Sequence, residues 1–413
     1  MRRSFYLLLP AFLLLVPFGL LAGEGNYRDF IVGDRAAGMG GAAIALATST
    51  ESCFYNPGGL ARTRNNTVSL SASIYGLATY RSDSGWSPGQ DIDVDSFLVI
   101  PTAFGSVWKL DERWVLAFSA FVPYLARSND LEAYPSTYEY YKYNKDDQSV
   151  WLGPSIACNV DESLSLGVSV FGVYRTFSWF RDILRYAQHT WSEDIKYNDL
   201  SLLAVVGAHY RLDRNWSFGL TVQPPSVHLS GSGELLTKQS YEDFVLVNYV
   251  DDAETENTIP AQVAAGAAWS EPGKWSVALD LIYHFAEKYN RLKGKDQFGT
   301  TWTYRIKYEP VLDVSLGGEY YVAENYPLRA GFFTSLSAAP DANPETSYYP
   351  GHINKYGLTA SIGRETENTS LNLGVNYSWG SGDFVGWGAE GTLVKVDARE
   401  SFLYVFAGSS YFF

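Results

Sequence analysis

The chain has few of the residues from which catalytic and metal sites are built. Its 413 residues include two cysteines, two methionines and five scattered histidines. No His-Glu-x-x-His, Gly-x-Ser-x-Gly or Cys-x-x-Cys sequence occurs. The sequence therefore predicts no enzyme, no metal site and no cofactor.

The two cysteines, Cys53 and Cys158, could pair in an oxidising compartment. Residues 152–160 alternate in polarity, which places Cys158 on the apolar face of an expected strand. Cys53 belongs to a separate N-terminal segment. The sequence favours free thiols over a disulfide.

Charged residues make up only 18% of the chain, and their balance is acidic, with a formal net charge of -14. Nucleic-acid binding depends on cationic contacts with phosphates, so a nucleic-acid partner is not expected. The acids gather at 91–95 and 251–256, in expected loops.

Long apolar runs are missing except at the N-terminus. There Arg2 and Arg3 precede an apolar stretch over 5–21, and Ala22 ends a suitable cleavage site. We predict a signal peptide over residues 1–22. A membrane anchor is the alternative, and two prolines within the stretch argue against it.

The rest of the chain shows alternation with period two, which is typical of strands. In residues 369–379, apolar side chains alternate with small polar ones, and residues 67–74 and 164–170 repeat the pattern. Aromatic residues, 16% of the chain, mark the strand ends, as in the interfacial girdles of membrane barrels. A soluble all-β domain would also alternate, but its strands would lack these girdles.

Six short polar turns recur along the chain, separated by strand, long loop and returning strand. They lie at 111–113, 161–163, 213–215, 271–274, 323–326 and 364–368. The expected long loops lie at 76–95, 125–148, 181–199, 228–258, 286–310, 335–353 and 380–400. This rhythm predicts an all-β fold, a transmembrane antiparallel β-barrel of fourteen strands in a bacterial outer membrane, with periplasmic turns and extracellular loops.

The C-terminus ends in an aromatic residue, Phe413, after Tyr411. Such an ending resembles the last-strand signal that the barrel assembly machinery recognises. We therefore expect this machinery and outer-membrane lipid as partners.

Residues 23–66 are rich in glycine and alanine, and break the pattern before the first strand. They are too short for an ordinary domain, so we predict an N-terminal plug, or hatch, inside a barrel of residues 67–413. The glycines suit close backbone packing. A phosphate loop would need a lysine that is absent here.

The hatch carries two motifs, Gly38-Met39-Gly40-Gly41 and Asn56-Pro57-Gly58. Together with the stretches at 100–124, 259–263 and 328–332, they resemble the FadL/TodX family of outer-membrane transporters. The resemblance covers essentially the whole mature chain. It implies a plugged fourteen-stranded barrel that carries fatty acids or hydrocarbons, and it places Asn56-Pro57 in a hatch turn near the periplasmic exit.

The residues expected to point into the lumen include candidate ligand-binding residues. They are Arg175, Lys355, Phe177, Phe402, Tyr404 and Phe406. An aromatic lumen with a few charges suits a hydrophobic ligand with a polar head, and a cation would hold a carboxylate. Ion pairs with lumenal or loop acids are the alternative for both cations. Arg329 and Glu319 are expected to form a structural ion pair.

These features predict passive outer-membrane transport of hydrophobic small molecules. The alternative is a barrel without transport activity, either a docking platform in secretion or a structural protein.

Overall fold

The computed structural model describes residues 25–28, 30–87, 90–134, 139–185, 189–240, 244–345, 351–387 and 393–413. The expected signal peptide, 1–22, lies outside these ranges. Among the helices in the described part of the chain, none is long and apolar enough to cross a membrane.

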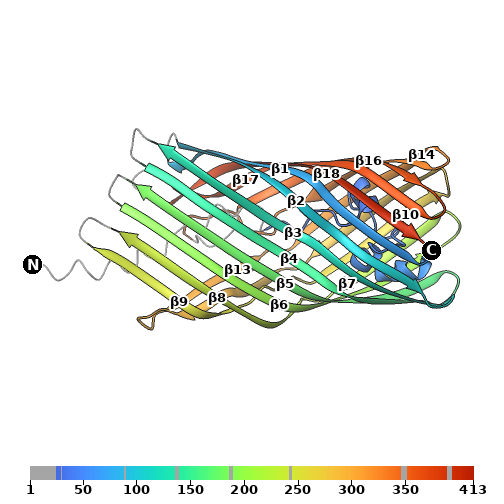
Figure 1. The fold of residues 1–413 in the computed structure, drawn as a ribbon, viewed down its shortest axis with the longest axis horizontal. Helices are drawn as coiled ribbons and strands as arrows, with labels where there is room; N and C mark the ends of the chain where they lie inside the picture. Colours follow the sequence, from blue (N-terminus) through green and yellow to red (C-terminus); the bar gives the residue numbers. More distant parts are fainter. Residues whose placement is uncertain are drawn as a thin grey trace, which may run out of the picture.

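One antiparallel sheet of eighteen strands forms the wall of the molecule (Figure 1). The strands are β1 Thr67–Ser87, β2 Gln90–Lys109, β3 Trp114–Tyr134, β4 Glu139–Asn159, β5 Leu164–Arg185, β6 His189–Arg211, β7 Trp216–Gln223, β8 Val227–Ser240, β9 Val245–Thr255, β10 Gln262–Glu271, β11 Trp275–His284, β12 Glu287–Lys295, β13 Thr301–Tyr308, β14 Val311–Ala323, β15 Tyr326–Ser335, β16 His352–Glu365, β17 Thr369–Trp387 and β18 Leu393–Phe412.

The sheet closes on itself through its first and last strands. Thr67 of β1 pairs with Val107 of β2 on one side and with Phe412 of β18 on the other. Four spans are each divided into two strands: β7 with β8, β9 with β10, β11 with β12, and β13 with β14. Counted once each, these give fourteen spans, which confirms the predicted barrel.

The four divisions lie side by side at one level of the wall. Gln223 pairs with Gln262, Gln262 with His284, and His284 with Val311, so four strand ends are in register. Proline follows or precedes three of these ends, at 224–225, 260 and 310. Because proline has no amide hydrogen, it interrupts the hydrogen-bonded ladder there.

The predicted short turns join strands at one end of the barrel. Three of them contain the same hydrogen-bonded turn. In each, the carboxylate of the first aspartate accepts hydrogen bonds from the backbone amides two and three residues later. Asp111 accepts from Arg113 and Trp114, both at 2.7 Å. Asp161 and Asp213 repeat this contact.

The expected long loops are largely strand. β1 continues to Ser87 and β2 begins at Gln90, so most of the loop expected over 76–95 is a β-hairpin. The same is true of 125–148 and 181–199. The expectation failed because these extensions mix polar and aromatic residues on both faces. Residues 336–345 lie outside any strand, as expected.

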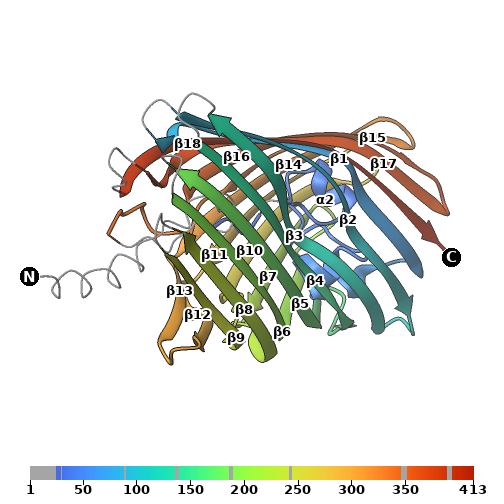
Figure 2. The same ribbon diagram turned by 60° about the vertical axis from the view of Figure 1, so that its left-hand side comes forward.

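The hatch lies inside the barrel near the end that carries the short turns (Figure 2). It contains the helices α2 Asp34–Gly38 and α3 Ser52–Tyr55 and the 3₁₀ helix η1 Pro57–Arg62. Residues 30–33, 36–45 and 56–61 are almost all buried. The hatch is therefore packed against the inner wall.

Gly40 shows how close this packing is. Its φ is 64°, and a Cβ there would stand 2.8 Å from the backbone nitrogen and oxygen of Phe332 in β15. We expect Gly40→Val to displace the hatch from the wall, since backbone strain alone costs ~1–3 kcal/mol. Cys53, which is fully buried in the hatch, should then react faster with a maleimide.

Gly273→Val is the matched control, because Gly273 has a φ of 73° but no neighbour within 4 Å of the added carbon. Equal labelling of Cys53 in the two variants would contradict the assigned contact.

Candidate functional site

The motif Asn56-Pro57-Gly58 fastens the hatch to β5 and β6. The fully buried Asn56 amide donates to the carbonyl oxygens of Ile44 (2.8 Å) and Ala208 (3.0 Å), and its oxygen accepts from the Gly58 amide (3.1 Å). Pro57 packs against Gly167 of the wall. One side chain thus links two hatch segments to a strand.

The motif Gly38-Met39-Gly40-Gly41 lies against β14, β15 and β16. Ser315 donates to the Gly40 carbonyl (2.8 Å), and Thr359 donates to the Gly38 carbonyl (3.0 Å). The Gly40 amide donates back to Thr359 (3.0 Å). Side chains of the wall therefore form hydrogen bonds with these hatch backbone groups inside the barrel.

Asp280 of β11 holds the middle of the hatch. Its carboxylate accepts from the amides of Ala43 (2.6 Å) and Ile44 (2.9 Å). His209 of β6 lies 3.1 Å from the Ala45 carbonyl. The role of these two side chains in holding the hatch follows only from the structure.

An ionic cluster joins the hatch to the wall near the short turns. Arg329 bonds to Glu319 (2.6 Å) and to Glu365 (2.8 Å), which confirms the expected Arg329–Glu319 pair. Arg35 of α2 also contacts Glu319 (2.9 Å). A hatch residue thus completes an ion-pair network of the wall.

Arg175 is engaged in a buried ion pair. It forms a bidentate contact with Asp147 (2.8 and 2.7 Å), also contacts Asn257, and lies over the Tyr124 ring. The alternative of an ion pair, left open by the sequence, is therefore the observed arrangement for Arg175. Phe177 stacks on Tyr197, with ring centroids 4.7 Å apart. These two rings belong to a different hydrophobic cluster from Phe402.

Phe402, Tyr404 and Phe406 do come together, and the hatch joins them. Phe30 packs on Phe402 and Tyr404, with centroids 5.3 and 5.8 Å away. The Tyr404 hydroxyl accepts from Asn376 (3.0 Å). These rings form an aromatic strip between the hatch and β18.

A pocket of about 100 Å³ opens beyond this strip, away from the short turns. Phe30, Phe402, Leu125 and Val94 supply its apolar surface. Its polar side contains cations and one carboxylate, from Arg127, Lys145, Lys355 and Glu400. The Lys355 amine lies 3.1 Å from Glu400.

The pocket touches both edges of a break in the wall. The pairing of β2 with β3 ends at Ala103 and Phe121, although β2 begins at Gln90 and β3 continues to Tyr134. Beyond that pair, the Asp93 amide of β2 donates to the Glu132 carboxylate of β3 (3.0 Å). Pro101 and Pro123 flank the start of the break.

The sequence missed part of this pocket. Phe30 lies outside the hatch motifs, and Leu125, Arg127 and Lys145 were assigned to a loop. A β-strand interpretation of 125–148 would have placed them in the lumen. Cys53 and Cys158 are free, as favoured. Among the described residues, no three His, Cys, Asp or Glu side chains cluster to hold a metal ion.

The fold and its interior contacts define a plugged fourteen-stranded membrane barrel. Residues 29–383 match the model of the outer membrane protein transport protein family (OMPP1/FadL/TodX). The chain belongs to this family, and is thus an outer-membrane transport protein.

Solved structures show the same fold at low sequence identity. The Pseudomonas putida toluene transporter TodX is 14% identical, with a TM-score of 0.71 over 94% of this chain and 100% of that one. A Pseudomonas aeruginosa FadL homologue is 13% identical (TM-score 0.70; 94% and 100%), as is the Ralstonia pickettii toluene transporter TbuX (0.64; 94% and 99%). No curated protein sequence matches the chain.

The Arg175 ion pair should be structural. Asp147 is fully buried, so Arg175→Met leaves a charge uncompensated and should lower the free energy of unfolding by ~3–5 kcal/mol. Urea titration of the refolded barrel measures this. Arg175→Met with Asp147→Leu should restore most of the loss.

The neighbouring pair Arg127–Asp146 is about half exposed, and serves as the control. Arg127→Met should cost ~0–1 kcal/mol. If Arg175→Met costs no more than Arg127→Met, Arg175 is not structural.

Glu51 makes hatch docking sensitive to pH. Its buried carboxylate accepts from the Ala36 amide (3.3 Å). Burial, followed by the Asp34 carboxylate, raises the pKa of Glu51 to about 7. The docked hatch then retains a proton that a solvated carboxyl would release, so docking weakens as pH rises from about 4.5 to about 7.

We expect the Ala36 amide to exchange hydrogen more readily at about pH 8 than at about pH 5, after correction for intrinsic exchange. Glu51→Gln should remove this difference. A pH dependence that persists in Glu51→Gln would show that another group is responsible.

Proposed function

We propose that this barrel carries hydrophobic small molecules with an anionic head, such as long-chain fatty acids, across the outer membrane. The pocket beyond the aromatic strip supports this proposal, because it combines apolar side chains with the amines of Lys145 and Lys355. An apolar surface with a few convergent polar groups is the usual form of a small-molecule site. The structures of similar fold include two toluene transporters.

The head group would lie beside Lys355, and the apolar tail beside Phe402 and Phe30. The carboxylate would replace Glu400 as the partner of the Lys355 amine. Charge-assisted hydrogen bonds of this kind are stronger than neutral ones. Of the residues suggested by the sequence, Lys355 and Phe402 line the proposed site, and Tyr404 and Phe406 continue the aromatic strip beside it. Arg175 and Phe177 support the wall.

The pocket is smaller than the ~300–1,000 Å³ of typical ligand sites. Phe30 belongs to the hatch, so its displacement would enlarge the pocket toward Tyr404. The break between β2 and β3 borders the same pocket, and gives a hydrophobic tail a sideways path that avoids water. We infer that the hatch regulates this space.

The barrel assembly machinery and lipid of the outer membrane complete the proposed set of partners. The aromatic C-terminus and the lipid-facing apolar side chains support them. A role as a docking platform or a structural protein would not require a pocket with these side chains.

Lys355→Met should weaken binding of a labelled long-chain fatty acid about tenfold, equivalent to ~1.4 kcal/mol. Affinity for toluene, which has no head group, should stay unchanged. Fluorescence titration of the purified barrel measures binding, and uptake into vesicles measures transport. Glu400→Gln should strengthen fatty-acid binding, because it removes the competing carboxylate.

Lys355→Met with Glu400→Gln controls for instability caused by an unpaired Glu400. If neither ligand binds or enters vesicles, transport of hydrophobic molecules is not the function. If both bind equally well to all variants, the head-group assignment is wrong.

A further inference from the structure

The lipid-facing wall carries a hollow on the side where the hatch is docked. Side chains that point outward from β14, β15 and β16 form paired rows across the strands. One row contains three small residues in succession, Gly318, Ala330 and Ala360. We call the depression in the outer surface along this row the trench.

Large residues bound the trench on both sides. The next row toward the extracellular end is Leu316, Phe332 and Leu358, and the next row toward the short turns is Tyr320, Leu328 and Ile362. The hollow extends from Val277 on β11 to Val405 on β18 and has a volume of about 1060 Å³. With strands about 4.8 Å apart, it is long enough for most of an extended acyl chain.

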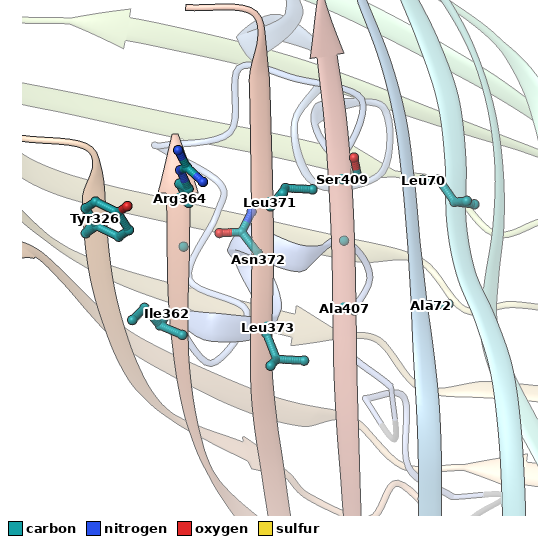
Figure 3. Close-up of a pocket in the computed structure, with 12 residues that line it drawn as sticks. Leu70, Ala72, Tyr326, Ile362, Arg364, Leu371, Asn372, Leu373, Ala407 and Ser409 are labelled. Carbon is teal, nitrogen blue, oxygen red and sulfur yellow. The ribbon is translucent and has the colours of Figure 1, made fainter. Parts of the chain in front are cut away.

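A second hollow shares Ile362 and Leu373 with the first. Figure 3 shows the residues that line this second hollow. Its volume is about 520 Å³, and small side chains, Ala72, Ala407 and Ser409, form its floor. Leu371 and Leu70 stand in the same row as Ser409, so this hollow also lies between larger side chains.

A cation stands beside the junction of the two hollows. Arg364 follows Ile362 by two residues on β16, points outward and lines the second hollow with Tyr326 (Figure 3). No ion pair or hydrogen bond of its guanidinium is recorded within the described ranges. Arg364 begins the turn to Thr369, so it lies at the level of the periplasmic head groups.

We propose that these hollows bind one two-chain anionic phospholipid of the periplasmic leaflet, with its phosphate on Arg364. One acyl chain lies in the trench and the other lies over Ala407 and Ala72. Arginine matches phosphate geometry with two donors, and tyrosine is favoured at this depth of a bilayer. Two apolar hollows that meet beside one cation correspond to two chains on one head group.

The inner face of the same strands holds the hatch. Gly317 and Gly331 lie against Met39 and Gly40, and Gly38 lies against Ser361. The wall is therefore thin here, with small residues on both faces. A bound lipid outside would support the three strands to which the first hatch motif is fastened.

The test is lipid binding to the intact barrel in a non-ionic detergent, followed by native mass spectrometry with added dioleoylphosphatidylglycerol. The wild type should retain one lipid after annular lipids are removed. Arg364→Gln should weaken retention about fivefold, the effect of one arginine near an anionic surface. Ala330→Leu with Ala360→Leu fills the trench and should weaken it at least as much.

Two variants serve as controls. Arg214→Gln removes an exposed arginine from another periplasmic turn, and Ala204→Leu enlarges an outward side chain on β6. Neither should change lipid retention. Heat-modified migration in gels confirms that each barrel is folded.

Equal retention by the wild type, Arg364→Gln and the filled trench would overturn the proposal. The proposal would also be overturned if Ala330→Leu with Ala360→Leu changed the oligomeric mass but not the number of bound lipids. The hollow would then be an interface between two copies of the barrel. Dioleoylphosphatidylcholine should bind more weakly than phosphatidylglycerol, and stronger binding would contradict an anionic ligand.

Discussion

The whole structure depends on backbone hydrogen bonding in a medium that offers none. Within hydrocarbon, each unpaired amide or carbonyl costs several kcal/mol, so a spanning sheet must close. Here closure is made by β1, which pairs with β2 and β18 along nearly its full length. At the interruptions near 224–226, 256–261 and 309–310, other wall segments or a loop supply partners. The Ser226 amide donates to the Ile259 carbonyl, and the Glu309 amide donates to the Ala338 carbonyl.

The same constraint explains why the lumen contains so many buried polar groups. The hatch has only short helices, so most of its backbone needs partners from outside itself. The wall provides them as side chains, among them Asp280 and Thr359. Asn56 supplies further hydrogen bonds from within the hatch. Polar lumenal residues therefore fasten most of the hatch, and Phe402 and Tyr404 contact it through the apolar ring of Phe30.

The strand number, the rim with short turns and the inward phase could be predicted from the sequence, because alternation and turn chemistry are local. Phe402, Tyr404 and Phe406 were placed inward correctly for this reason. The partner of Arg175 could not be predicted, since Asp147 becomes its neighbour only through the register of β4 and β5 in a segment expected to be a loop. Phe30 likewise reaches the pocket through the path of the hatch, and no periodicity specifies that path.

Small residues on the two faces of one strand have separate causes in this wall. Gly317 and Gly331 face inward, where the backbone of Met39 and Gly40 leaves no room for a side chain. Nothing inside the barrel requires Gly318, Ala330 and Ala360 to be small, because they point to lipid. Lipid tails alone also tolerate Leu or Val there, as the adjacent rows show. A small outward row between two large ones therefore indicates a shaped contact, and the same three strands connect that contact to the hatch.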